Sequence, residues 1–536
     1  MTMAHLLEVR NLSVRFHTAH GIVDAVKNVS WYLDRGETLA ILGESGSGKS
    51  VSSSAIMNLI DCPPGEIASG EIMFDGRDLL KASAEERRRI NGKRIAMIFQ
   101  DPLSHLNPVY TVGWQLREVM LVHGVAPAEA ASRGLDLMRR VGIPEPEGSL
   151  GKYPHEFSGG QRQRIMIAMA LAMKPDIIIA DEPTTALDVT VQAEVLRLLE
   201  ELQEEMGLGL VLITHDLGVV AEIADRVVVM NGGEIVESGT PSEIYHNAKH
   251  PYTRRLISAA PGRGEMNAPV RGADPVLKVD RATKTYGTFK ALNEVSFELQ
   301  KGEVLAVVGE SGSGKSTVAK AILRLIEADS GQALWKGRDL FKMSPRDLYA
   351  MRRDIQMVFQ DPTQSLNPRM SIFQIISEAW VIHPEILPKA KWRDRVAELL
   401  AQVGLSPEHA RRYPHQFSGG QRQRIAIARA LALEPEMIIA DEAVSALDVS
   451  IQAQVIDLLG KLKRELGIAF IFIAHDLPVV RDFADHVMVM EKGRVVEIGT
   501  VREIFDNPRE LYTRRLLAAG LDPDPEVQKA RRLAVA

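Results

Sequence analysis

The sequence is short of cysteine, of long apolar runs and of excess positive charge. Cys62 is the only cysteine among 536 residues, so neither an internal disulfide nor a site with several cysteine ligands can form. No window reaches the roughly 18 apolar residues that a membrane-spanning helix needs. The formal net charge of −6 gives no support to a nucleic-acid binder, which neutralises many phosphates with Lys and Arg.

The N-terminal stretch is too polar for a secretory signal, because it reaches Glu8 and Arg10 before an apolar core can form. Together with the single cysteine, this predicts a protein of a reducing, cytoplasmic compartment. Any role at a membrane would then require partner subunits.

Two segments occur twice, which indicates a duplicated domain. GESGSGKS stands at 43–50 and 309–316, and FSGGQRQRI stands at 157–165 and 417–425. The offset falls from 266 to 260 residues, so the first half carries six extra residues, around a turn at 61–65. We predict two domains, 1–262 and 276–536, joined by a Pro- and Gly-rich linker at 263–275.

Apolar strands alternate with helical segments in each half. A strand at 304–308 enters the glycine loop, and further apolar strands at 438–440 and 470–474 end in polar residues. This pattern predicts an α/β fold with a mainly parallel sheet and sites at the carboxyl ends of its strands. The mostly helical stretches that follow Gln100 and Gln360 predict an inserted helical subdomain in each half.

The repeated G-x-x-x-x-G-K-S pattern is typical of a loop that cradles phosphates. Its backbone N–H groups and the N-terminus of the next helix attract an anion, Lys49 and Lys315 would reach the β- and γ-phosphates, and Ser50 and Ser316 would bind Mg²⁺. A Gly- and Ser-rich turn is the alternative. Two copies, each after an apolar strand, favour the phosphate loop.

In each half an apolar strand ends in adjacent acids, Asp181-Glu182 and Asp441-Glu442. In a P-loop ATPase, an Asp at this place orders the Mg²⁺ shell, and the next carboxylate can act as a general base toward the attacking water. A single strand ending in two acids is better explained as a surface turn. At a repeated distance behind a phosphate loop, the catalytic interpretation is favoured.

The motif at 158–161, SGGQ, and its copy at 418–421 resemble the signature sequence of ABC ATPases, and the resemblance extends over nearly the whole chain. It implies two P-loop ATPase domains, each with a parallel sheet core, a helical subdomain and an antiparallel β subdomain. In that family the signature helix binds the γ-phosphate held by the opposite half. The resemblance therefore implies that 418–420 complete the Lys49 site and that 158–160 complete the Lys315 site.

Other family positions match one by one. Gln100 and Gln360 are similar to the Q-loop glutamines, His215 and His475 to the switch histidines, and 187–188 and 447–448 to the loops through which the halves communicate. Phe16 and Tyr286 lie where the family stacks an aromatic ring on adenine, although core packing is an equal alternative for them. Ala443 replaces the Pro183 of the first half, which removes no functional group.

The resemblance thus implies ATP and Mg²⁺ as cofactors. The residues expected to contact ATP are Phe16, Gly43, Ser45, Gly46, Gly48, Lys49, Ser50, Val51, Gln100, Ser158, Gly159, Gly160, Gln161, Asp181, Tyr286, Gly309, Ser311, Gly312, Gly314, Lys315, Ser316, Thr317, Gln360, Ser418, Gly419, Gly420, Gln421 and Asp441. The residues expected to hold Mg²⁺ are Ser50, Gln100, Asp181, Ser316, Gln360 and Asp441. The catalytic residues expected are Glu182, His215, Glu442 and His475.

Several stretches resemble the branch that powers import of dipeptides, oligopeptides and nickel chelates. They are FQDPLSHLNP at 99–108, FQDPTQSLNP at 359–368, ALDVSIQAQ at 446–454, HPYTRRL at 250–256 and LYTRRL at 511–516. The resemblance implies an ATPase for peptide import, peripheral on the cytoplasmic face of the inner membrane, whose two halves pair as a pseudo-dimer. It also implies two integral-membrane permease subunits and, through them, an extracytoplasmic solute-binding protein. The permeases would bind 103–118 and 363–378, although ordinary packing in the subdomain core is an equal alternative for these segments.

Two alternatives differ in class. Soluble ABC proteins that act on ribosomes or nucleic acid also carry paired halves, usually with a long charged linker or zinc-binding cysteines. The short linker, the single cysteine and the acidic balance favour the importer. A scaffold of inactive ATPase halves is disfavoured because both halves keep their Lys, Asp, Glu and His.

Overall fold

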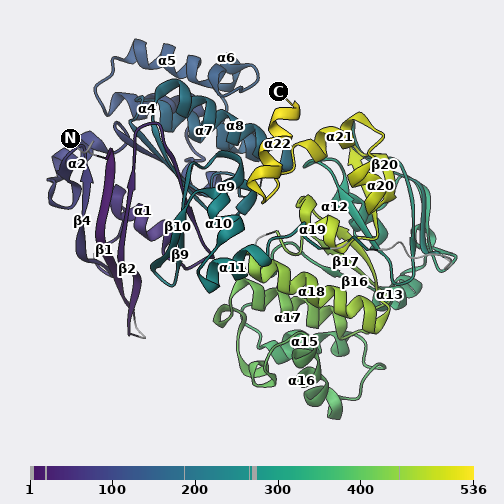
Figure 1. Cartoon of the computed structure of the whole chain (residues 1–536). Helices are drawn as coiled ribbons and strands as arrows, with labels where there is room; N and C mark the ends of the chain where they lie inside the picture. The colour runs from purple at the N-terminus through teal and green to yellow at the C-terminus, as the bar shows by residue number, and fades with distance from the viewer. Residues whose placement is uncertain are drawn as a thin grey trace. The chain divides into compact units, whose positions relative to one another are not determined.

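Two mainly parallel six-stranded sheets, one in each half, organise the chain in a computed structural model (Figure 1). The structure describes residues 5–18, 21–185, 187–264, 266–267, 275–445 and 447–535, without the side chains of 103, 534 and 535. Ala446 and most of the predicted linker lie outside these residues. The described chain forms one unit of Met1–Ala259 with Leu521–Ala536 and a second unit of Ala260–Gly520. Two segments lie on the other side of our predicted boundaries, because 260–262 belong to the second unit and 521–535 belong to the first.

The parallel sheet of the first unit has the order β10-β9-β3-β8-β7-β6, in which only β10 runs antiparallel to its neighbour. All residues of β3, β7 and β8 are buried, as expected for strands covered on both faces. The strands are β3 (Thr38–Leu42), β6 (Ile95–Ile98), β7 (Ile177–Asp181), β8 (Gly209–Thr214), β9 (Arg226–Asn231) and β10 (Glu234–Gly239).

An antiparallel sheet of order β2-β1-β4-β5 packs against one face of the parallel sheet. Its inward residues Leu12, Val29 and Ile72 share one apolar core with Ile41 of β3. The strands are β1 (Leu7–Thr18), β2 (Gly21–Leu33), β4 (Gly65–Phe74) and β5 (Arg77–Asp78).

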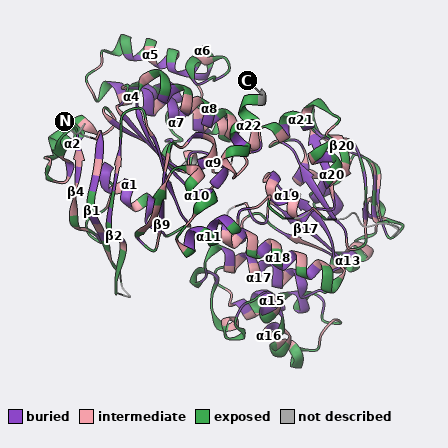
Figure 2. Ribbon diagram, in the orientation of Figure 1, coloured by how far each residue is buried: buried purple, intermediate pink, exposed green. Residues whose placement is uncertain are grey.

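Helices α4, α5, α7, α8 and α9 of the first unit share a second apolar core with the other face of the parallel sheet, whereas α1 packs in the first core (Figure 2). The helical subdomain consists of α3 (Pro102–His105), α4 (Val112–Leu121), α5 (Pro127–Arg140) and α6 (Pro146–Ser149). The other helices are α1 (Lys49–Met57), α2 (Ala84–Ile90), α7 (Gly159–Leu171), α8 (Val189–Met206), α9 (Leu217–Ile223), α10 (Pro241–Asn247), α11 (Pro251–Ser258) and, from the C-terminus, α22 (Pro525–Val535).

The second unit repeats this architecture, with sheet orders β16-β17-β18-β13-β19-β20 and β12-β11-β14-β15. Its strands are β11 (Pro275–Tyr286), β12 (Phe289–Gln300), β13 (Val304–Val308), β14 (Ser330–Trp335), β15 (Arg338–Asp339), β16 (Ile355–Val358), β17 (Met437–Asp441), β18 (Ala469–Ile473), β19 (His486–Glu491) and β20 (Arg494–Thr500). Its helices are α12 (Lys315–Ile322), α13 (Pro345–Asp354), α14 (Pro362–Ser365), α15 (Ile372–Ile382), α16 (Trp392–Gln402), α17 (Gly419–Leu431), α18 (Val449–Leu466), α19 (Leu477–Phe483), α20 (Val501–Asp506) and α21 (Leu511–Ala518).

The predicted α/β class, with a helical and an antiparallel subdomain in each half, is confirmed. Across the described residues, the model contains no helix whose length and apolar character would suffice to span a bilayer.

Candidate functional site

The glycine loop joins β3 to α1 in the first unit and β13 to α12 in the second. Gly48 lies at φ 99° at the N-cap of α1, and a Cβ there would stand 2.5 Å from the Ala25 carbonyl oxygen. A Cβ at Gly43 would stand 2.3 Å from the Met230 carbonyl oxygen. Glycine is therefore required at both positions, by backbone conformation in one case and by close packing in both.

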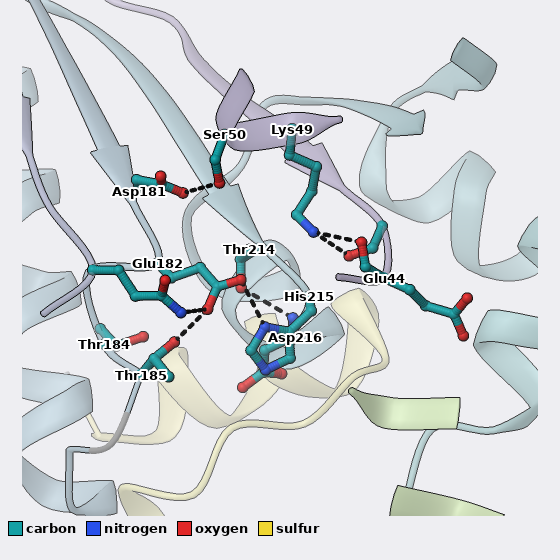
Figure 3. A network of polar contacts seen from close by, with 12 residues as sticks. Glu44, Lys49, Ser50, Asp181, Glu182, Thr184, Thr185, Thr214, His215 and Asp216 are labelled. Carbon is teal, nitrogen blue, oxygen red and sulfur yellow. Dashed lines mark hydrogen bonds and ion pairs between the residues drawn. The ribbon is translucent and has the colours of Figure 1, made fainter. Parts of the chain in front are cut away.

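The loop lysine points back across this loop. Lys49 Nζ donates to the carbonyl oxygens of Gly43 at 2.7 Å and Glu44 at 2.9 Å (Figure 3). Lys315 makes the equivalent bonds at 2.7 and 3.0 Å, and both side chains are buried. Each ammonium group is thus held beside the N-terminus of a helix, where an anion is stabilised.

A serine and an aspartate meet next to the lysine in each unit. Ser50 Oγ donates to Asp181 Oδ1 at 3.0 Å, as Figure 3 shows, and Ser316 Oγ donates to Asp441 Oδ1 at 3.0 Å. The serine comes from the first turn of a helix, and the aspartate ends a buried strand. Such hydroxyl and carboxylate oxygens suit Mg²⁺, which takes few protein ligands and completes its shell with phosphate and water. The residues present therefore fit the predicted metal.

The next residue in each unit, Glu182 or Glu442, has an unusual backbone, with φ at 46° and 47°. A non-glycine residue seldom adopts this conformation, which is enriched at functional sites. The conformation is the same before Pro183 and before Ala443, so the proline is not what produces it.

Two predicted residues bind this glutamate in the first unit. Gln100 Nε2 donates to Glu182 Oε2 at 2.6 Å, and His215 Nδ1 lies 3.1 Å from Glu182 Oε1. Thr185 also donates its hydroxyl to Glu182 Oε2 at 3.0 Å. We did not predict Thr185, because a hydroxyl three residues after the acid has no motif of its own.

The second unit forms the same group with one looser contact. Gln360 Nε2 donates to Glu442 Oε2 at 2.7 Å, whereas His475 Nδ1 lies 3.7 Å from that oxygen. Ser445, at the position of Thr185, donates to the main-chain oxygen of Glu442 instead of its carboxylate.

The adjacent carboxylates differ in acidity. Burial raises the pKa of Asp181 and of Asp441. Burial also acts to raise the pKa of Glu182, but the hydrogen bond and charge of His215, with Lys49, outweigh it and lower the pKa overall. The neighbouring His475 likewise lowers the pKa of Glu442. Neighbouring acids with pKa values moved in opposite directions are typical of acid–base sites.

The signature motifs begin α7 and α17 and form capping boxes there. Ser158 Oγ accepts from the Gln161 amide at 3.3 Å, and Gln161 Oε1 accepts from the Ser158 amide at 3.0 Å. A Cβ at Gly160 would lie 2.4 Å from Val191, whereas one at Gly159 would meet nothing within 4 Å. The second glycine is thus needed to pack on the neighbouring helix, and the first leaves room for a ligand.

The two predicted adenine-stacking rings lie in different surroundings. Phe16 is half-buried and packs against the core under β4, and Tyr286 is 49% exposed at the end of β11. Their contact with adenine stays a prediction.

Comparison with known families agrees with this geometry. The model of the ABC transporter family matches residues 26–185 and 292–445, which together make up more than half of the chain and contain both phosphate loops, both signature motifs and both Asp-Glu pairs. The chain belongs to the ABC transporter family. A second model, described as the oligopeptide/dipeptide transporter C-terminal region, matches 236–281 and 496–535 of this ABC protein.

Curated relatives extend the match to full length. The glutathione import ATP-binding protein GsiA of Shigella boydii serotype 4 is 47% identical over 574 residues, covering 99% of this chain and 92% of that protein. GsiA of Escherichia coli K12 gives the same values, and GsiA of Salmonella typhimurium LT2 is 47% identical over 570 residues, covering 98% and 91%.

These matches confirm the predicted family and branch. This ABC protein is a tandem ATPase that binds ATP and serves an importer of the peptide type.

Proposed function

We propose that this ABC ATPase powers the import of glutathione or another short peptide. The main support for this proposal is the 47% identity to glutathione import ATPases across 99% of the chain. A match to the oligopeptide/dipeptide C-terminal region in both halves supports a peptide cargo. The nickel chelates of the same branch are the main competing cargo.

Uptake by a deletion strain tests the cargo. We expect the strain to lose import of labelled glutathione or of some di- or oligopeptide, and the wild-type gene to restore it. Normal uptake across a broad peptide panel, together with lost nickel or sugar uptake, would overturn the proposal. Complementation with a Lys49→Ala, Lys315→Ala double variant serves as the control, because it keeps the chain but removes the phosphate lysines.

For catalysis, we propose that Glu182 and Glu442 accept a proton from the water that attacks the γ-phosphate. The lowered pKa keeps each glutamate ionised at neutral pH, and Gln100 or Gln360 holds one oxygen so that the other can face the water. His215 and His475 lie beside the same carboxylates and would contact the γ-phosphate.

Mg²⁺ would be held by Ser50, Asp181 and the Gln100 side-chain oxygen, and by Ser316, Asp441 and Gln360 in the second unit. When bound, it would neutralise phosphate charge during hydrolysis. Lys49 and Lys315 would leave their carbonyl partners to bind the phosphates.

Glu182→Gln and Glu442→Gln test these roles, since the amide keeps the shape but cannot take the proton. A lost general base costs about a hundredfold in turnover or more. We expect steady-state ATPase activity of the assembled transporter to fall by about that factor, with ATP affinity within about twofold of wild type. Full ATPase activity of either variant would contradict the proposed role of that glutamate as a general base.

We further propose that the chain binds two integral-membrane permease subunits at the cytoplasmic face and, through them, an extracytoplasmic solute-binding protein. A groove of about 460 Å³ in the second unit supports this, because it combines apolar walls with nearby exposed side chains. Its lining includes Met357, Phe359, Ile375 and Ile382, and Ile382 is 53% exposed. An apolar groove of this kind suits a helix of a partner.

Co-purification tests this surface. Ile382→Glu should release the permeases while leaving ATP binding unchanged, and Leu466→Glu, at an equally exposed residue outside the groove, is the control. Equal recovery of the permeases with both variants would count against the groove.

Finally, we propose that the two halves pair as a pseudo-dimer within one chain, so that each signature motif serves the phosphate loop of the other half. The family resemblance supports this pairing. The short linker favours it further, because it raises the effective concentration of one half for the other.

A further inference from the structure

The last segment of the chain, 521–535, folds into the first unit, although it follows the second half in sequence. Its helix α22 packs on α9 and α10 of that unit (Figure 1). Leu521 enters the apolar core there, and a Cβ at Gly218 of α9 would lie 2.8 Å from Leu521 Cβ. The residue at 218 must therefore be small for this segment to dock.

Polar contacts fix the segment in register. The buried side chain of Gln528 donates to Glu222 Oε2 at 2.6 Å and accepts from the Asp522 amide at 2.7 Å. Arg532 donates to the main-chain oxygen of Glu222 at 2.7 Å and to both oxygens of Glu200 at 2.8 and 2.7 Å. Both bonds to Glu200 come from the same guanidinium nitrogen, Nη2, and hydrogen bonds between charged groups are stronger than those between neutral groups.

The second unit receives a segment in the same way. Residues 260–264 and 266–267 follow α11 of the first half but belong to the second unit, where they contact α19 and the residues just after it. The amides of Gly262 and Gly264 donate to Asp482 of α19 at 2.6 and 3.1 Å, and Asn267 donates to the Phe483 carbonyl oxygen at 2.8 Å.

The two docking points correspond within the repeat. Asp482 stands 260 residues after Glu222, the offset of the switch histidines, and Leu521 stands 260 residues after Pro261. Equivalent tails thus bind an acid at equivalent positions of α9 and α19, and each tail binds in the unit that the other half of the sequence builds.

Both receiving helices begin directly after a switch histidine. Asp216, next to His215, caps α9 by accepting from the Gly218 amide at 2.7 Å. The two docking points on α9, Gly218 and Glu222, are about one helical turn apart. A segment bound at both points restrains the helix that begins two residues after His215.

We propose that each tail is a strap that positions the switch histidine of the unit to which it binds, 521–535 for His215 and 260–267 for His475. The strap residues act through the helix and are positioning residues. The catalytic consequence rests on the histidine role in the proposed function, but the mechanical restraint does not.

Hydrogen exchange in the full-length chain tests the restraint. Arg532→Ala should speed amide exchange in 217–223 by about tenfold or more, because local opening follows the loss of docking contacts, and leave 477–483 unchanged. Asp482→Asn should do the reverse. Lys529→Ala removes an exposed charge from the same helix and is the matched control. Unchanged exchange in 217–223, or equal changes in both helices, would overturn the strap.

Kinetics of the assembled transporter tests the positioning. Arg532→Ala should lower kcat for ATP hydrolysis about threefold with KM for ATP within about twofold, and Arg532→Lys, which can keep one bond, should recover part of the loss. Faster exchange with unchanged kcat would overturn the positioning role. That result is distinct from failure of the proposed function, which full activity of Glu182→Gln and Glu442→Gln would reveal.

Discussion

The two units share the lysine, serine–aspartate and glutamine–glutamate contacts of the phosphate site and differ in the buried polar pairs at the base of the sheet. The serine–aspartate bond is 3.0 Å in both, and the glutamine–glutamate bond is 2.6 Å in one and 2.7 Å in the other. At the N-terminal end of the central strand the units differ. Asp485 is buried with Lys463 at 2.6 Å in the second unit, whereas Gln203 takes the place of that lysine in the first.

A second difference lies beside it. Glu37 pairs with Arg226 at 2.8 Å in the first unit, and Glu303 pairs with His486 at 2.6 Å in the second. The serine–aspartate and glutamine–glutamate contacts are thus kept in both units, whereas the buried polar pairs at the N-terminal end of the central strand differ in residue type. The predictions below test where this division holds.

The largest effect is expected at the signature glycines. Gly419→Asp adds a negative charge at the N-terminus of α17, where it stabilises the helix but repels the γ-phosphate. It should lower hydrolysis by about a hundredfold, as loss of a preorganised anion donor does, in the site of the opposite half. Photolabelling with azido-ATP, followed by cleavage between the halves, assigns the trapped nucleotide to Lys49 or Lys315.

The choice of Gly419 comes from the structure. A Cβ at Gly420 would lie 2.1 Å from Ile451 of the same unit, so a change there would disturb its own half, whereas Gly419 has its nearest neighbour at 3.8 Å. Gly159→Asp is the reciprocal variant. If Gly419→Asp lowered ATP hydrolysis at the Lys315 site alone, that result would contradict pairing between the halves.

Loss of Lys463 in the second unit should lower the unfolding free energy more than loss of Gln203, which takes its place in the first. Lys463→Met removes the ion pair of the buried Asp485 carboxylate and leaves it the hydrogen bond from the Val304 amide, which costs about 3 kcal/mol of unfolding free energy. Gln203→Met removes one neutral bond to Gly36, worth about 1 kcal/mol. Urea unfolding of the full chain, followed by unit-resolved hydrogen exchange, measures both. Equal losses of unfolding free energy from the two substitutions would contradict the difference between the units.

The histidine makes the second unit sensitive to pH. The carboxylate of Glu303 beside its ring raises the pKa of His486 against the effect of burial. The stability from this pair is therefore complete below the ordinary histidine pKa of about 6.5 and is lost as pH rises through the raised value.

Thermal unfolding from about pH 6 to about pH 9 should accordingly weaken the second unit more than the first, whose Arg226 keeps its charge. His486→Arg should remove the difference, and Arg226→His should transfer the dependence to the first unit. A pH profile unaltered by both exchanges would refute this explanation.

The smallest effect is expected at Thr185. Thr185→Ala removes a hydrogen bond to the Glu182 carboxylate, worth about 1 kcal/mol and so about fivefold in rate if the bond is kept in the transition state. Ser445→Ala should change turnover less than twofold, because Ser445 bonds to the main chain of Glu442. Single-turnover ATPase rates separate the two variants.

The fold and most of the candidate site could be predicted from the sequence because their signals are local or repeated. Buried strands read as short apolar runs, and the polar residues that end them, such as Asp181 and His215, converge because parallel strands share one edge. The glycines were predicted from their motif, whereas the carbonyl oxygens of Ala25 and Met230 that require them lie on other strands.

The remaining features depend on distant partners. Gln528 donates to Glu222, which lies 306 residues earlier in the chain, and no sequence motif indicates that these two residues are in contact. The docking of 521–535 also reverses the expected assignment of this segment, because a repeat suggests that each half keeps its own ends. Thr185 was not predicted because its hydroxyl reaches the Glu182 carboxylate through the left-handed backbone of Glu182, which the sequence does not reveal.

The exchanged tails limit how this gene could be divided or recombined. A cut in the linker between the halves would leave residues 260–267 on one polypeptide and their receiving helix α19 on the other, and the same would hold for 521–535 and α9. A half transplanted from another transporter would arrive without the matching tail. The fusion is therefore more than a tether, because each product of such a division would be missing a piece of its own structure.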